Sequence, residues 1–199
     1  MLDNARTRSL AAYILDPVAK ALLAMRLSAS AVTVLGAIGS IVVSICFIAQ
    51  GRFLVAAVLM LPLAGADAID GTMARISNSV GPWGAFLDST TDRITDGAIF
   101  ASVAWWFIAQ GEPFAGAAAL VALIAGFVTS YVRAKAESLG VECKVGIAER
   151  PERVGGVMLG LFLAGLGFEG MLTFLTILIA LLACITVAQR VVVVRRALI

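Results

Sequence analysis

Long apolar runs separated by short polar segments constrain this chain more than any other feature of its sequence. Of its 199 residues, 61% are hydrophobic and only 14% are charged, whereas an average soluble domain has about a quarter charged residues. An apolar run of about 20 residues crosses a bilayer as a helix, because a helix pairs its backbone polar groups internally. We therefore predict an all-α, polytopic membrane protein.

Turn and breaker residues divide the sequence into six predicted transmembrane helices. The first begins after capping serines at Ser28 and Ser30 and ends near residue 49. The others are expected at about 53–75, 84–108, 114–139, 151–167 and 171–196. Before them, residues 3–26 place apolar side chains on one helix face and basic side chains on the other faces. This pattern is typical of an amphipathic helix lying at the membrane interface. We predict a single membrane domain over 1–199, with the juxtamembrane amphipathic helix at 3–26 and a six-helix bundle at 28–199.

The basic residues predict the orientation of this bundle. If both termini lie in the cytoplasm, all 15 lysines and arginines except Arg52 fall on the cytoplasmic side, as the positive-inside rule requires. We therefore expect a multi-pass protein of the plasma membrane with both termini facing the cytoplasm.

Four acids interrupt the apolar runs near one end of the second and third predicted helices. Asp67 and Asp70 are three residues apart, and Asp88 and Asp92 are four apart, so each pair projects from one helix face. The short connection containing Gly81 makes the two helices antiparallel neighbours and brings both pairs to the same depth. Carboxylates gathered in this way favour Mg²⁺ or Mn²⁺, and two such ions can hold a phosphoryl group during its transfer.

Two other interpretations of the acids are open. They could form an ion-pair network with Arg75 and Arg93, although four acids against two arginines leave charge uncompensated. They could also line the pathway of a cation transporter, but the acids lie toward one end of their helices rather than through the membrane depth. Since histidine is absent, any general base must be a carboxylate, a lysine or a tyrosine.

The acids belong to a longer pattern with a known resemblance. The sequence Asp67-x2-Asp70-Gly71-x2-Ala74-Arg75-x8-Gly84-x3-Asp88-x3-Asp92 resembles the complete signature of the CDP-alcohol phosphotransferase family. The resemblance implies an enzyme that moves a phosphatidyl group from CDP-diacylglycerol to an alcohol and releases CMP. It also implies a homodimer.

The same resemblance implies roles for individual residues. Asp67, Asp70 and Asp88 would be metal ligands, and Asp92 would contribute to the metal site and act as the base that deprotonates the acceptor. The residues implied to line the CDP-diacylglycerol site are Gly71, Ala74, Arg75 and Gly84, joined by Ser30, Ala31, Val32, Thr33 and Gly81. Asp96 continues the face of Asp88 and Asp92 outside the signature, and we interpret it as a packing or supporting acid.

Basic residues on the cytoplasmic side point to the acceptor alcohol. Arg133, Lys135, Arg153 and Arg195 (or its neighbour Arg196) could form a pocket for a phosphorylated alcohol. The alternative is that such residues only set topology and attract anionic lipid headgroups. The residues for which we prefer this alternative are Arg150, Arg190 and Arg196.

Two segments extend the resemblance to one group of enzymes. Residues 130–137 and 149–153 resemble the actinobacterial phosphatidylinositol phosphate synthases, which implies inositol phosphate as the acceptor and phosphatidylinositol phosphate and CMP as products. A phosphatidylglycerophosphate synthase, which would use glycerol 3-phosphate, is the alternative because it shares the fold and the signature.

Overall fold

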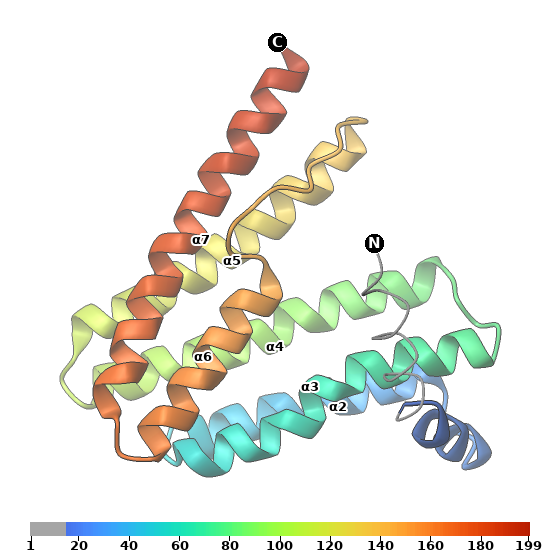
Figure 1. Cartoon of the computed structure of the whole chain (residues 1–199), viewed down its shortest axis with the longest axis horizontal. Helices are drawn as coiled ribbons and strands as arrows, with labels where there is room; N and C mark the ends of the chain where they lie inside the picture. The colour runs from blue at the N-terminus through green and yellow to red at the C-terminus, as the bar shows by residue number, and fades with distance from the viewer. Residues whose placement is uncertain (1–14) are drawn as a thin grey trace, which may run out of the picture. The chain divides into compact units, whose positions relative to one another are not determined.

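The computed structural model describes residues 15–199, apart from the side chain of Glu169. Residues 15–24 are helical, and the remaining elements are labelled in Figure 1. They are α2 (Ala29–Val43), the π-helix η1 (Ser44–Ile48), α3 (Phe53–Ile76), α4 (Pro82–Ala109), α5 (Pro113–Ser138), α6 (Arg150–Gly165) and α7 (Glu169–Leu198). No strand occurs between residues 15 and 199, so the predicted all-α class is confirmed over this range. The first part of the predicted amphipathic helix, residues 3–14, lies outside the described residues.

The helix boundaries follow the breaker residues of the sequence. Pro113 occupies the first turn of α5, where its missing N–H does no harm. Gly51 and Gly111 have positive φ angles of 75° and 80°, a conformation that suits glycine at the end of a helix. The predicted helices at 53–75 and 114–139 therefore correspond closely to α3 and α5.

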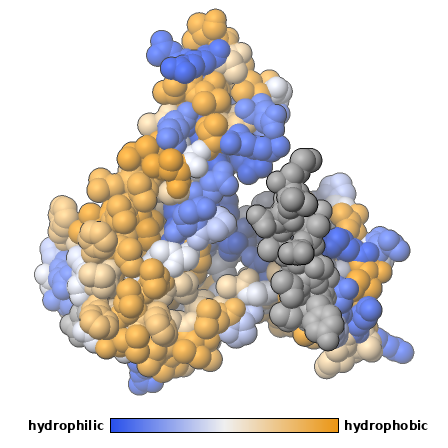
Figure 2. Space-filling view, in the orientation of Figure 1, coloured by the Kyte–Doolittle hydropathy of each residue, from blue (hydrophilic) through white to orange (hydrophobic). Residues whose placement is uncertain are grey.

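Four helices among the described residues are long and apolar enough to cross a bilayer. They are Ala29–Ile48, Phe53–Ile76, Pro113–Ser138 and Gly170–Leu198. The other two long helices, α4 and α6, do not meet these criteria, because α4 carries several charged residues and α6 has only 16 residues. Exposed hydrophobic side chains cover much of the visible surface along α7 in Figure 2, as expected for a surface that faces lipid. The chain is a membrane-embedded helical protein.

The structure divides into two compact units, which we describe separately. The first contains residues 15–42 and Leu59–Thr95. Within it, α2 and α3 approach closely at small residues. A Cβ built on Gly36 would lie 3.0 Å from the Cβ of Ala66, and one on Gly39 would lie 2.8 Å from Leu63 Cδ2. Small residues of this kind allow helix backbones to come together where no water is present to drive association.

The second unit contains Val43–Val58 and Asp96–Ile199. In it α7 packs against both α5 and α6, and the antiparallel pair α6–α7 is seen in orange and red in Figure 1. The fully buried side chains Val157 and Leu161 of α6 and Leu172 of α7 contribute to the core. This unit carries all the basic residues that the sequence assigned to the acceptor.

Candidate metal and substrate site

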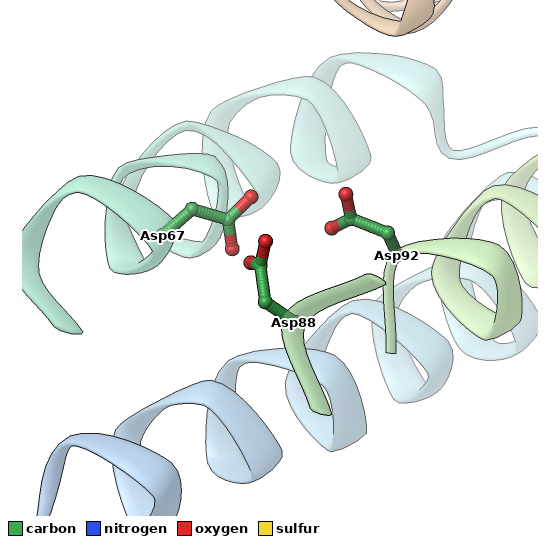
Figure 3. Close-up of side chains that lie close together, drawn as sticks. All are labelled: Asp67, Asp88 and Asp92. Atoms are coloured by element: carbon green, nitrogen blue, oxygen red, sulfur yellow. The ribbon is translucent and has the colours of Figure 1, made fainter. Parts of the chain in front are cut away.

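Three of the four predicted acids converge in the first unit. Carboxylate oxygens of Asp67, Asp88 and Asp92 lie within 4.8 Å of one another. Figure 3 shows the side chain of Asp67 on α3 pointing toward those of Asp88 and Asp92, which lie one turn apart on α4. Asp67 and Asp88 are exposed and Asp92 is partly buried. The predicted convergence of the two helix faces is therefore present for these three residues.

The chemistry of this donor set fits a divalent cation. Three carboxylates at such separations repel one another, and a cation between them removes the repulsion. Their oxygens are the hard ligands that Mg²⁺, Mn²⁺ and Ca²⁺ take in proteins. The three side chains reach the same region from two helices, and two of them, Asp67 and Asp88, are exposed.

Asp70 lies in a different environment from the other three acids. Its residue is only 7% exposed, and its Oδ2 accepts a short hydrogen bond from the hydroxyl of Thr33 on α2. The same hydroxyl lies 3.1 Å from the carbonyl oxygen of Ala29. Thr33, which the family resemblance placed in the CDP-diacylglycerol site, thus holds the carboxylate of a predicted metal ligand.

The two arginines near the acids differ in their contacts. Arg93 Nη2 lies 3.5 Å from Asp92 Oδ2, so part of the alternative ion-pair network is present. Arg75 Nη2 instead donates to Thr72 Oγ1 over 2.8 Å. The Arg75 residue is exposed, which makes its charge accessible to an anion.

The remaining residues predicted to line the CDP-diacylglycerol site lie in the same unit as the acids. A Cβ on Gly71 would lie 3.7 Å from Arg75 Nη1, whereas one on Gly81 or Gly84 would meet nothing within 4 Å. The backbone is therefore accessible at these glycines. Gly84 is exposed, and the partly buried members of the set are Ser30, Ala31, Val32, Gly71, Ala74 and Gly81.

The four predicted acceptor residues of the second unit have unlike surroundings. Lys135 and Arg195 are exposed, and Arg133 Nε pairs with Glu137 Oε1 at 2.9 Å near the surface. Arg153 is only 2% exposed. Three of the four side chains are thus accessible to a solute, and the fourth is part of the interior.

Sequence reasoning missed the structural importance of Arg190. It was assigned to topology, yet it is only 3% exposed. Its three guanidinium nitrogens donate to Val145 O (2.8 Å), Thr129 O (2.9 Å) and Glu149 Oε1 (3.0 Å). Its position inside the apolar run of the last helix could have indicated this role, because a charge in an apolar run usually has a specific partner.

Comparison with known proteins supports the family that the signature suggested. The family model for CDP-alcohol phosphatidyltransferase matches residues 26–188. The chain is 38% identical over 195 residues to the phosphatidylinositol phosphate synthase of Cutibacterium acnes, covering 94% of each protein. It is 40% identical over 162 residues to the enzyme of the same name from Corynebacterium glutamicum, covering 80% of this chain and 74% of that protein.

Solved structures of a related protein match the fold. The crystal structure of Mycobacterium tuberculosis phosphatidylinositol phosphate synthase with CDP-DAG bound gives a TM-score of 0.87 at 32% identity, over 92% of this chain and 94% of that one. The structure of the same protein in complex with manganese and citrate gives 0.88 at 32% identity, over 91% and 88%. The family match, the full signature and the converging acids together establish that the chain belongs to the CDP-alcohol phosphatidyltransferase family.

Proposed function

We propose that this protein transfers the phosphatidyl group of CDP-diacylglycerol to inositol phosphate, giving phosphatidylinositol phosphate and CMP. The observation that carries the proposal is the convergence of Asp67, Asp88 and Asp92 at their positions in the family signature. The relatives from Cutibacterium acnes and Corynebacterium glutamicum, both phosphatidylinositol phosphate synthases, favour inositol phosphate as the acceptor.

The acid cluster is the proposed metal site. Asp67, Asp70, Asp88 and Asp92 would hold Mg²⁺ or Mn²⁺, and we favour two ions. Bound there, the metal supplies positive charge that neutralises the diphosphate and stabilises the transition state of phosphoryl transfer. The manganese complex of the Mycobacterium tuberculosis protein supports this assignment. Asp70 would serve as a ligand by turning from Thr33 toward the other three acids.

Asp92 is the proposed general base. Its side chain is partly buried and belongs to the acid cluster, and we place the acceptor hydroxyl next to it. The hydroxyl oxygen forms a new bond to the β-phosphorus of CDP-diacylglycerol as its proton passes to Asp92. The bond from that phosphorus to the CMP oxygen breaks, and CMP leaves with the electron pair.

Positively charged and accessible groups bind the two substrates in this proposal. Arg75 is exposed close to the accessible backbone at Gly71, so it can pair with the diphosphate of the lipid donor. Arg133, Lys135 and Arg195 can pair with the phosphate of inositol phosphate, with Arg153 behind them. Free inositol carries no charge to pair with these cations.

We further propose a six-span arrangement in the plasma membrane. In it α4 and α6 join the four apolar helices as membrane spans, so both termini face the cytoplasm with the active site. The single catalytic domain would function as a homodimer. The excess of basic residues at the cytoplasmic ends supports this orientation.

Release of CMP from CDP-diacylglycerol by the purified protein tests the proposed chemistry. With Mg²⁺ or Mn²⁺ and inositol phosphate we expect turnover, and with EDTA we expect none. Asp92→Asn should retain binding of CDP-diacylglycerol but lower kcat by about 100- to 10,000-fold, because the proton acceptor is lost. Glu112→Gln removes an exposed carboxylate from the α4–α5 connection and is the matched control. Near-normal turnover of Asp92→Asn would contradict its assignment as the base.

A further inference from the structure

Thr72 is a buried threonine of α3 that lies between the signature residues Gly71 and Ala74. The residue is 4% exposed, and it occupies a position that the signature leaves variable. Its hydroxyl donates to the carbonyl oxygen of Ala68 at 2.8 Å, and the hydroxyl oxygen accepts a hydrogen bond from Arg75 Nη2 at 2.8 Å. The hydroxyl therefore acts as a donor and as an acceptor at once, which fixes its orientation.

The hydrogen bond to Thr72 determines where the Arg75 side chain lies. A residue three positions earlier is on the neighbouring turn of a helix, so the Arg75 side chain runs back along α3 toward the beginning of the helix. The surroundings of Gly71 agree with this, because a Cβ added there would lie 3.7 Å from Arg75 Nη1. The guanidinium thus lies beside the backbone of a glycine, which has no side chain to cover it.

This location brings the guanidinium toward the acid cluster. Asp67, Gly71 and Arg75 follow one another at intervals of four residues along one side of α3. Asp67 belongs to the cluster with Asp88 and Asp92. Glycine at the middle position places no side chain between the guanidinium and Asp67. An anion bound at the cluster can therefore extend along α3 to the guanidinium.

The contact with Thr72 orients the charge of Arg75 without cancelling it. The hydroxyl is neutral and Arg75 is exposed, whereas Arg93 lies 3.5 Å from the carboxylate of Asp92. A guanidinium recognises phosphate through several N–H donors in one plane. When that plane is held in place in advance, less conformational entropy is lost as the phosphate binds.

We propose that Thr72 is a positioning residue for the lipid donor: its hydroxyl holds the Arg75 guanidinium beside Gly71, where the guanidinium binds the diphosphate of CDP-diacylglycerol. The inference rests on the proposed function for the identity of the donor, and it applies to any acceptor alcohol. Because Thr72 is buried, it acts through Arg75 and not by contact with the substrate.

Steady-state kinetics of Thr72→Val test this role. Valine matches threonine in shape but has no hydroxyl, so the Arg75 guanidinium loses its fixed position. We expect KM for CDP-diacylglycerol to rise by about five- to tenfold, with kcat and KM for inositol phosphate changed by less than about twofold. Thr72→Ser keeps the hydroxyl and should stay within about twofold of wild type. Thr72→Ala is measured instead if the valine variant does not fold.

Thr90→Val is the matched control. Thr90 also donates to a carbonyl oxygen four residues earlier, that of Phe86, at 2.8 Å. Its replacement removes the same kind of hydrogen bond but leaves the partner of Arg75 in place, so both KM values should stay at the wild-type level. The proposal is overturned by an unchanged KM for CDP-diacylglycerol in Thr72→Val, by an equal rise for both substrates, or by a serine variant as impaired as the valine variant.

A double-mutant cycle tests whether Thr72 acts through Arg75. Arg75→Gln alone should raise KM for CDP-diacylglycerol, and adding Thr72→Val should raise it by less than about twofold more, because the group that Thr72 orients is already gone. Multiplying effects would contradict the coupling.

Equilibrium binding of radiolabelled CDP-diacylglycerol to the purified proteins separates this role from the proposed function. Wild type should bind the lipid about five- to tenfold more tightly than Thr72→Val, in line with the expected change in KM. Wild type that binds the lipid but releases no CMP with inositol phosphate would overturn only the proposed function. Equal binding by wild type and Thr72→Val would overturn the positioning role.

Discussion

At the scale of single residues, Thr33 and Asp70 link α2 to α3 through a buried hydrogen bond. Asp70 is 7% and Thr33 9% exposed, and the threonine hydroxyl donates to the carboxylate. A hydrogen bond to a buried charged group contributes more than one between neutral groups, and its loss leaves the charge without that partner. The bond stabilises the first unit and fixes one of the four signature acids.

Replacement of Thr33 by valine tests this contact. Valine has almost the same shape but no hydroxyl, so we expect Thr33→Val to lower the free energy of unfolding by about 1–3 kcal/mol. Thr33→Ser keeps the donor and should lose less. Thermal unfolding in detergent with EDTA measures the effect without a contribution from metal. A valine variant as stable as wild type would show that the hydrogen bond is not stabilising.

The sequence predicted which acids share a helix face, but not the other contacts of each acid. Spacings of three and four residues in Asp67–Asp70 and Asp88–Asp92 determine which side chains share a face, and three of the acids do converge. The spacing could not show that Asp70 bonds to Thr33, because that contact depends on how α2 packs against α3. The burial of Arg153 and Arg190 depends on tertiary packing in the same way.

At the scale of elements, the end of α6 is held by a close backbone contact. A Cβ built on Gly165 would lie 2.5 Å from the backbone nitrogen of Leu54, which is far inside van der Waals contact. Backbone atoms cannot move aside as a flexible side chain can. Glycine at this position therefore allows α6 to pack against the beginning of α3 within the second unit.

Alanine substitutions at two glycines of α6 are expected to differ in their effect on stability. Gly165→Ala should destabilise the protein by about 1–3 kcal/mol, because the added methyl group forces the backbones apart. Gly155, where an added Cβ would meet nothing within 4 Å, is the matched control. Gly155→Ala should be neutral or stabilise by up to about 1 kcal/mol through helix propensity. Thermal unfolding of both variants measures the difference, and equal melting temperatures would contradict the close contact.

The segment between α5 and α6 is held in place by polar side chains of α7. Arg190 on α7 donates to Val145 O and to Glu149 Oε1, and Thr186 Oγ1 accepts a hydrogen bond from Ala148 N at 3.0 Å. The extended segment is therefore attached to α7 by polar groups rather than by a regular ladder of backbone bonds.

Limited trypsin digestion tests this attachment. Lys144 is well exposed, with 66% of its side chain accessible, and the next residue is bound by Arg190. Arg190→Gln should release the segment and accelerate cleavage after Lys144, because proteolysis requires local opening. Arg196→Gln, which changes an exposed arginine of the same helix, should cleave at the wild-type rate. The same rate in all three proteins would mean that Arg190 does not restrain the segment.

At the scale of the whole molecule, the order and ends of the helices were predictable from the sequence. Hydrophobic runs and breakers such as Gly111 and Pro113 locate the helix ends, because these residues act locally. Membrane orientation depends instead on the distribution of charge over all connections, so it stays a prediction until it is measured.

Reporter fusions test the proposed orientation. Green fluorescent protein fused after Ile199 should fluoresce, since it folds in the cytoplasm. Alkaline phosphatase inserted at Gly111, between α4 and α5, should be active, since it requires an oxidising compartment. The reverse pattern would contradict the placement of both termini in the cytoplasm.

The central claim is that the converging acids transfer a phosphatidyl group to a phosphorylated inositol. Its most direct test is CMP release from CDP-diacylglycerol by the purified protein, with inositol phosphate, glycerol 3-phosphate and free inositol compared in parallel. We predict metal-dependent release with kcat/KM for inositol phosphate at least about tenfold above that for glycerol 3-phosphate, and negligible release with free inositol. Preference for glycerol 3-phosphate, or release that persists in EDTA, would contradict the account.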